Sequence, residues 1–173
     1  MKYIITNTLY THVYFDMDGV LTDLDKVIDE HNINRNCRNS LFGWMSSMTN
    51  YTESRLFETL PANPYINDFK NLIQVLKDSG VVVSTLTSLG NMNITTPIYN
   101  QKQTWLKNNG LDIHYLAVPE SKCKQYLAHP KALLIDDKLS NVEEFRNAGG
   151  SSVEYSIANH DGAFDDILHE LSL

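Results

Sequence analysis

Short apolar runs alternate with helical patterns over most of the chain, and this alternation constrains the fold more than any other feature. The strand-like runs occupy residues 12–16, 81–87, 113–118, 132–136 and 152–156. The helical patterns occupy residues 66–79, 96–110, 119–128, 140–149 and 164–171. Strands separated by helices predict βαβ units, whose right-handed crossovers build a parallel sheet. We therefore expect an α/β, Rossmann-like three-layer sandwich.

Local signals at the ends of helices support this reading. Gly80 is a natural stop for the helix that begins near residue 66. Thr96, followed by Pro97, is typical of an N-cap and a first-turn proline. Ser140 and Glu143 have the spacing of a capping box, which predicts that the next helix begins at Ser140.

One stretch, between Leu24 and Pro64, interrupts the alternation. Its roughly forty residues show no strand pattern and are rich in Asn, Ser, Met and aromatic residues, and a plain loop of that length is uncommon in a compact domain. We predict a small helical cap at 24–64, inserted after the first strand. The α/β core is then formed by residues 1–23 and 65–173.

Composition limits the classes of partner. With 173 residues the chain suits one domain with a small insertion. Its net charge is −7, and its 14 Lys and Arg residues form no run, so binding to a nucleic-acid polymer is not expected. A small anionic substrate is compatible with this charge if a divalent cation supplies local positive charge.

The sequence also predicts where the chain resides. Cys37 and Cys123 are isolated, as expected for reduced thiols in a cytosolic protein. No apolar run approaches the roughly 20 residues that span a bilayer, and the N-terminus is too polar for a signal peptide. We expect a cytoplasmic protein without membrane contact.

Acidic and hydroxyl side chains follow several of the predicted strands. They are Asp16 and Asp18, Thr87 and Ser88, and Asp136 and Asp137. Ligands of open parallel sheets bind outside the carboxyl ends of the strands. Four carboxylates gathered there would repel one another unless a cation neutralised them. Because all the donors are oxygen atoms, Mg²⁺ is a better candidate than zinc.

These residue types suit phosphoryl transfer. A carboxylate can attack phosphorus, and a second carboxyl two residues later could protonate the leaving oxygen and then activate water. A Thr hydroxyl, backbone N–H groups and a lysine would bind the phosphoryl oxygens in the transition state. Lys122 and Lys124, just before the fourth strand, are the candidate lysines.

The order of these motifs also resembles a known family. DMDGV at 16–20, Thr87-Ser88, a lysine and then LLIDD at 133–137 are similar to the haloacid dehalogenase (HAD) superfamily of phosphatases. The match extends to the 5′(3′)-deoxyribonucleotidases and their phage and bacterial relatives, through DMDGVLTDLDK, FETLP, LTSLG, KQTWL and LLIDDKLSN. For such relatives the compartment is the bacterial cytoplasm, or that of the host for a phage-encoded protein.

The resemblance implies a role for each residue. Asp16 resembles the nucleophile and Asp18 the acid/base, while Thr87, with Ser88, resembles the phosphate-binding site. Lys124, twelve positions before Asp136, best resembles the motif lysine, with Lys122 as the alternative. The metal would be held by Asp16, Asp136, Asp137 and the backbone carbonyl of Asp18.

The function implied is that of a Mg²⁺-dependent phosphomonoester hydrolase with an aspartyl-phosphate intermediate. Its expected substrate is a deoxynucleoside monophosphate, and another small phosphomonoester is the alternative. A non-catalytic Mg²⁺- and phosphate-binding module, or a receiver-like switch, is a more remote alternative. In receiver domains the acidic pair comes first and the lysine last, whereas here the lysine precedes Asp136 and Asp137.

The predicted cap contains aromatic residues that could stack on a nucleobase. Trp44 is the preferred platform because indole has the largest flat face, and Phe42 and Tyr51 are the second-ranked candidates. The alternative is that these side chains form the small core of the cap itself.

Overall fold

Four parallel strands form the central sheet of the computed structural model, which describes residues 9–30, 55–90 and 95–173. Their order is β2-β1-β5-β6, with bounds β1 His12–Phe15, β2 Val82–Thr85, β5 Ala132–Asp136 and β6 Ser151–Glu154. β1 lies inside the sheet, pairing in parallel with β2 on one side and β5 on the other. Every residue of β5 is buried, as expected for an inner strand of a parallel sheet.

A second, two-stranded sheet continues from β2. It pairs β3, Thr87–Ser88, in parallel with β4, Ala117–Val118. The run 81–87, predicted as one strand, therefore divides at Leu86, whose N–H still donates to Phe15, while the N–H of Thr87 donates to Leu116. This change of partner carries Thr87 and Ser88 away from β1 and towards β4.

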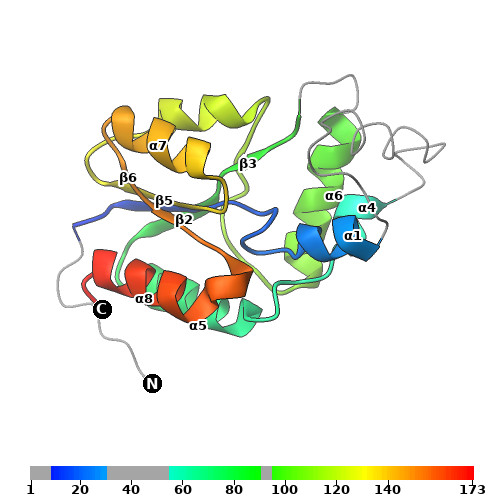
Figure 1. Cartoon of the computed structure of the whole chain (residues 1–173), viewed down its shortest axis with the longest axis horizontal. Helices are drawn as coiled ribbons and strands as arrows, with labels where there is room; N and C mark the ends of the chain where they lie inside the picture. Colours follow the sequence, from blue (N-terminus) through cyan, green and yellow to red (C-terminus); the bar gives the residue numbers. More distant parts are fainter. Residues whose placement is uncertain (1–8, 31–54, 91–94) are drawn as a thin grey trace.

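Helices cover both faces of the sheet (Figure 1). α7 and the short 3₁₀ helix η1 lie on one face, and α5 and α8 lie on the other. Their bounds are α5 Ile66–Asp78, η1 Ser121–Leu127, α7 Leu139–Asn147 and α8 His160–Glu170, with a further 3₁₀ turn, η2, at Ile157–Asn159. The predicted three-layer α/β sandwich is confirmed.

Three helices gather beyond the carboxyl end of β1 (Figure 1). They are α1 Leu24–Glu30, α4 Leu56–Thr59 and α6 Thr95–Asn108. The indole N–H of Trp105 on α6 donates to the carbonyl of Leu60 at 2.8 Å, and Val27 and Phe57 join the same apolar cluster as Phe15. Because residues 31–54 lie outside the described part of the chain, the cap boundaries stay a prediction.

Three predicted helix starts are wrong, and one of them is that of α8, which begins at His160 rather than at residue 164. α6 already includes Thr95, so Thr96 lies within the helix, and Pro97 is accommodated in the first turn, where its missing N–H costs nothing. α7 begins at Leu139, without a side-chain cap from Lys138 and with Ser140 as its second residue. The reason is that Asp136 binds this helix start, because its Oδ1 accepts the N–H of Lys138 at 3.0 Å and the amide of Asn141 at 2.8 Å.

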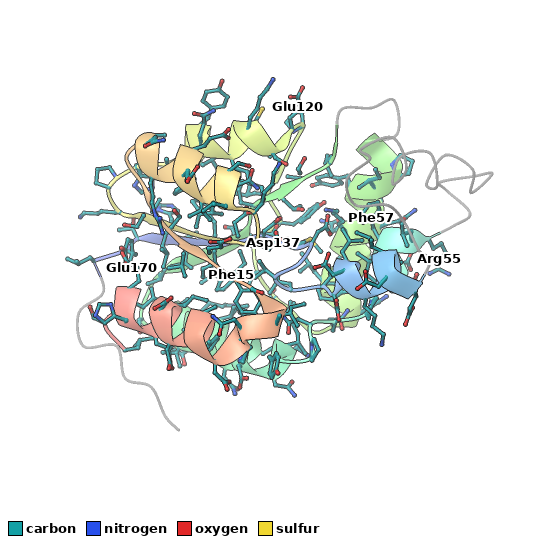
Figure 2. The ribbon with its side chains drawn as sticks, in the orientation of Figure 1. Phe15, Arg55, Phe57, Glu120, Asp137 and Glu170 are labelled. Atoms are coloured by element: carbon teal, nitrogen blue, oxygen red, sulfur yellow. The ribbon has the colours of Figure 1, made fainter. Side chains whose placement is uncertain are left out.

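The core fills the space between the sheet and its helices (Figure 2). On the α5 and α8 side, the rings of Phe15, Tyr155 and Phe164 contact Phe69 edge-on, with ring centroids 5.1 to 5.9 Å apart. Such edge-to-face contacts are favourable in addition to the apolar area that they bury. In the described ranges, none of the helices is long and apolar enough to span a membrane.

Candidate active site

A tight turn after β1 places the first two aspartates. The N–H groups of Leu21 and Thr22 both donate to the carbonyl of Met17, at 2.9 and 2.8 Å. Gly19 has a φ of +89°, and a Cβ there would come within 2.4 Å of Oδ2 of Asp137. Glycine is therefore required at this position both by the backbone conformation and by the closeness of the Asp137 carboxylate.

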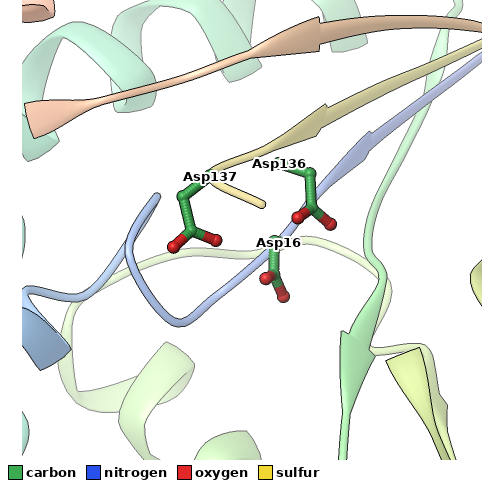
Figure 3. A group of neighbouring side chains, drawn as sticks. All are labelled: Asp16, Asp136 and Asp137. Atoms are coloured by element: carbon green, nitrogen blue, oxygen red, sulfur yellow. The ribbon is translucent and has the colours of Figure 1, made fainter. Parts of the chain in front are cut away.

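Three carboxylates meet at the carboxyl ends of β1 and β5 (Figure 3). Asp16, Asp136 and Asp137 each offer an oxygen within 4.8 Å of the others. Burial, and then repulsion by Asp16 and Asp136, raise the pKa of Asp137 to about 8. Asp16 and Asp136 are buried, whereas Asp137 keeps exposed surface as a residue although its carboxyl group is crowded by its neighbours.

This carboxylate group fits a hard divalent cation. Its donors are three oxygen atoms with neither His nor Cys among them, a set that suits Mg²⁺ better than zinc. A bound cation would also relieve the repulsion that raises the Asp137 pKa. The carboxyl group of Asp18 lies outside this group, which leaves its backbone carbonyl as the predicted ligand.

Lys124, on η1, neutralises part of this charge. Its Nζ lies 2.6 Å from Oδ2 of Asp136 and 3.0 Å from Oδ1 of Asp16, and the residue is buried. Burial alone would lower the pKa of Lys124, but the two carboxylates hold it above the ordinary value. Lys122 is instead paired with Glu120 at 2.9 Å on the exposed side of η1. Of the two predicted lysines, the structure brings Lys124 to the aspartates.

A second buried lysine, Lys102 on α6, was not predicted as a site residue. Its Nζ lies 2.7 Å from Oδ2 of Asp18, 2.7 Å from Oγ1 of Thr87 and 3.2 Å from the carbonyl of Ser88. The ring of Phe57 lies beside it, with its centroid 5.0 Å from Nζ. Lys102 has no exposed surface, so these neighbours, rather than water, stabilise its positive charge.

The sequence did contain a signal for Lys102. It stands four residues after Ile98 and three before Trp105, so the three share one face of α6, and all three are buried. A lysine on the buried face of a helix requires a counter-ion, because an unpaired buried charge is costly.

Of the remaining predicted groups, Asp18 and Ser88 line the pocket of the site, whereas Thr87 is buried beside Lys102. Burial raises the pKa of the Asp18 carboxyl, and Lys102 opposes that shift. Oδ1 of Asp18 is buried and has no hydrogen-bond partner in the described ranges. Thr87 is buried, and the hydroxyl of Ser88 accepts the N–H of Gly90 at 3.2 Å.

A pocket of about 420 Å³ opens over these groups, within the range of small-molecule sites. Its polar lining residues are Asp16, Asp18, Asp25, Ser88, Ser121, Lys124, Asp137, Lys138 and Asn141. Its apolar lining residues are Leu24, Leu56, Phe57, Leu89 and Ile98. The predicted base-stacking residues Phe42, Trp44 and Tyr51 lie outside the described residues.

Comparison with known proteins adds a fold relationship. No protein-family model matches the sequence, and no curated protein matches it. Among solved structures, the chain is similar to a HAD-superfamily hydrolase from Ehrlichia chaffeensis, with a TM-score of 0.56, 13% identity, and coverage of 97% of this chain and 100% of that one. It also matches an uncharacterized protein from Corynebacterium glutamicum at a TM-score of 0.48 and 19% identity, over 94% and 96% of the two chains. The chain therefore shares the fold of a HAD-superfamily hydrolase.

Proposed function

We propose that the protein is a Mg²⁺-dependent phosphomonoester hydrolase of the HAD type, with a deoxynucleoside monophosphate as its substrate. The observation that carries the proposal is the position of Asp16. Its carboxylate lies at a strand end, contacts Lys124, gathers with the carboxylates of Asp136 and Asp137, and lines an open pocket. The fold shared with a HAD-superfamily hydrolase supports the same class of reaction.

Asp16 is the proposed nucleophile. Its Oδ1 accepts the N–H of Met17 at 2.7 Å and lies 3.0 Å from Nζ of Lys124, which leaves Oδ2 to attack phosphorus. In the first step this oxygen forms a bond to phosphorus as the bond to the leaving oxygen breaks, which gives an aspartyl phosphate. Lys124 faces the same pocket and would bind a phosphoryl oxygen as negative charge shifts in the transition state.

Asp18 is the proposed acid and base. Its unpartnered Oδ1 would donate a proton to the leaving oxygen in the first step. In the second step the same oxygen takes a proton from the water that attacks phosphorus, so that phosphate leaves and Asp16 is restored. The raised pKa of Asp18 favours the protonated form that the first step needs.

Mg²⁺ would be held by Asp16, Asp136 and Asp137, the three carboxylates that gather in the site. When bound, it would neutralise charge on these carboxylates and on the phosphoryl group. Thr87 contributes in another way: because its Oγ1 accepts a hydrogen bond from Lys102, its own hydroxyl proton is available for a phosphoryl oxygen.

The apolar residues of the pocket support a leaving group with an apolar face. Leu24, Leu89 and Ile98 line the pocket together with its polar groups, so a substrate bound there meets hydrocarbon as well as polar atoms. A nucleobase suits such a mixed lining better than the hydroxyl-rich face of a sugar phosphate does.

The proposal is tested by phosphate release from a panel of monophosphates in Mg²⁺. The panel contains the deoxynucleotides, the matching ribonucleotides, ribose 5-phosphate and glycerol phosphate, each also assayed in EDTA. We expect the highest kcat/KM for deoxynucleotides and no turnover in EDTA. Release of phosphate from sugar phosphates alone would support the hydrolase reaction but contradict the proposed deoxynucleotide substrate. If no phosphate is released from any compound, a non-catalytic binding module replaces the hydrolase.

A further inference from the structure

We propose that Lys102 is a positioning residue, which fixes the carboxyl group of Asp18 by its Oδ2 so that Oδ1 alone faces the reacting oxygen. The inference rests on the proposed hydrolase function and deepens it. It assigns a role to a buried cation that lies outside the carboxylate group, on a different helix from every other polar group of the site.

The contacts of Lys102 use its whole hydrogen-bonding capacity. An ammonium group has three protons, and Nζ has three acceptors, on Asp18, Thr87 and Ser88, at 2.7, 2.7 and 3.2 Å. The residue has no exposed surface, and it is absent from the lining of the pocket. Lys102 therefore reaches a substrate only through the groups that it holds.

The two oxygens of Asp18 are left in different states by this contact. Oδ2 accepts a charge-assisted hydrogen bond from Lys102, while Oδ1 is buried without a partner in the described ranges. A free carboxyl group can rotate and exchange its oxygens, whereas one anchored through Oδ2 cannot do so without losing the ion pair. The same ammonium bonds Thr87, so the acid and the phosphate-binding hydroxyl share one anchor.

The location of Lys102 also ties this anchor to the helices above the sheet. α6 packs against α4, and the ring of Phe57 on α4 lies beside the ammonium. The backbone N–H of Phe57 in turn donates a hydrogen bond to Oε1 of Gln101, the neighbour of Lys102, at 3.0 Å. The side chain of Asp18 is thus tied to α6 and α4, whereas that of Asp16 is tied to η1 through Lys124.

The test is to replace Lys102 by Met, which has a similar length but no charge and no donors. Phenyl phosphate and p-nitrophenyl phosphate are compared, because they have similar shapes and differ in how much their leaving oxygen needs a proton. The value measured is kcat/KM, which reports the step in which the leaving group departs. Lys107→Met is the matched control, since Lys107 is exposed on the same helix.

We expect Lys102→Met to lower kcat/KM for phenyl phosphate at least about tenfold more than for p-nitrophenyl phosphate, because a misplaced acid matters most for the more basic leaving group. Lys107→Met should change neither value by more than about twofold. An equal loss on both substrates, or no loss, would overturn the inference while leaving the hydrolase intact. If the unchanged protein releases phosphate from neither aryl phosphate nor any compound of the monophosphate panel, the proposed function itself fails.

A second variant keeps the test decisive if Lys102→Met does not fold. Removing both charges in Asp18→Asn/Lys102→Met avoids leaving the carboxylate buried without a partner. It is compared with Asp18→Asn alone. We expect Lys102→Met to change both substrates by the same factor in this background, because the acid that it positions is gone. A leaving-group dependence that persisted there would show that Lys102 acts independently of Asp18 and would overturn the inference.

Discussion

Two buried lysines hold the two aspartates of the DMDG turn, and they do so from different parts of the molecule. Lys124 lies on η1, against one face of the sheet, and contacts Asp16 and Asp136. Lys102 lies on α6, beyond the carboxyl end of the sheet, and contacts Asp18. Lys124 lines the pocket and Lys102 does not. One lysine can therefore contact substrate, whereas the other can only orient a neighbour.

The comparison separates two contributions to the proposed reaction. Lys124 contacts the proposed nucleophile and would bind the phosphoryl group, so a substitution of Lys124 should lower the rate equally for every substrate. Lys102 contacts the proposed acid, so the loss of rate on substituting Lys102 should depend on the leaving group.

The largest effect is expected for Asp16→Asn. Asn has nearly the same shape but is a far weaker nucleophile, so kcat should fall by at least about 10³-fold for phenyl phosphate and p-nitrophenyl phosphate alike. Circular dichroism should show that the protein is still folded. Asp165→Asn, an exposed change on α8, is the matched control and should leave kcat unchanged. A residual rate above a few per cent would exclude Asp16 as the nucleophile.

Lys124→Ala should lower kcat/KM by on the order of 10²–10³, the scale for losing one preorganised donor to developing charge. The loss should be the same for the two aryl phosphates, in contrast to that expected for Lys102→Met. Lys122→Ala provides the control, because Lys122 is exposed and pairs only with Glu120. A larger loss for Lys122→Ala would mean that the sequence spacing and the structure both indicate the wrong lysine.

The two lysines also show how far sequence reasoning could go. Lys124 was found because its spacing to Asp136 resembles that of the family's motif lysine. The polar residues at the strand ends were found because a parallel sheet gathers them. Lys102 lies 84 residues from Asp18 in sequence, and no local sequence pattern predicts that α6 packs over the turn after β1. Its only signal, a lysine on a buried helix face, indicates a counter-ion without identifying it.

The fold was predicted better than its details for the same reason. Hydrophobic periodicity identified the strands and helices of the sandwich, since each needs one buried face. The division of 81–87 between two sheets was not predicted, because it depends on which strand Thr87 meets. The helix start at Leu139 was missed because Asp136, a residue of the site, replaces the predicted cap. The roles of Phe42, Trp44 and Tyr51 stay predictions.

The carboxylate group on the Lys124 side should make thermal stability depend on pH when metal is absent. The pKa of Asp137 is raised from 3.8 to about 8, so between these values the folded protein keeps a proton that the unfolded chain releases. Stability in EDTA should therefore fall as the pH rises through this window, with the Tm dropping by more than about 3 °C between pH 5 and pH 8. Mg²⁺ should remove most of the drop.

Asp137→Asn is the control that separates the contribution of the Asp137 carboxyl group from that of the other ionisable groups. Its Tm in EDTA should change less between pH 5 and pH 8 than that of the unchanged protein. Scanning calorimetry at both pH values, with and without Mg²⁺, supplies the comparison. An equal change of Tm between pH 5 and pH 8 in the two proteins would mean that Asp137 does not carry the raised pKa.

The smallest effect is expected for Trp105→Phe, which tests whether the ammonium of Lys102 or the seating of its helix orients Asp18. The change removes the N–H that donates to Leu60 at 2.8 Å and leaves that carbonyl buried, which should cost about 1–3 kcal/mol of stability. The three acceptors around Lys102 remain, so the kcat/KM ratio of the two aryl phosphates should change by less than about threefold. Tyr126→Phe, at a residue 78% exposed, should alter neither stability nor the ratio. If Trp105→Phe shifted the ratio as far as Lys102→Met does, the packing of α6, rather than the ammonium of Lys102, would orient Asp18. The two lysines would then differ only in the helix that carries them.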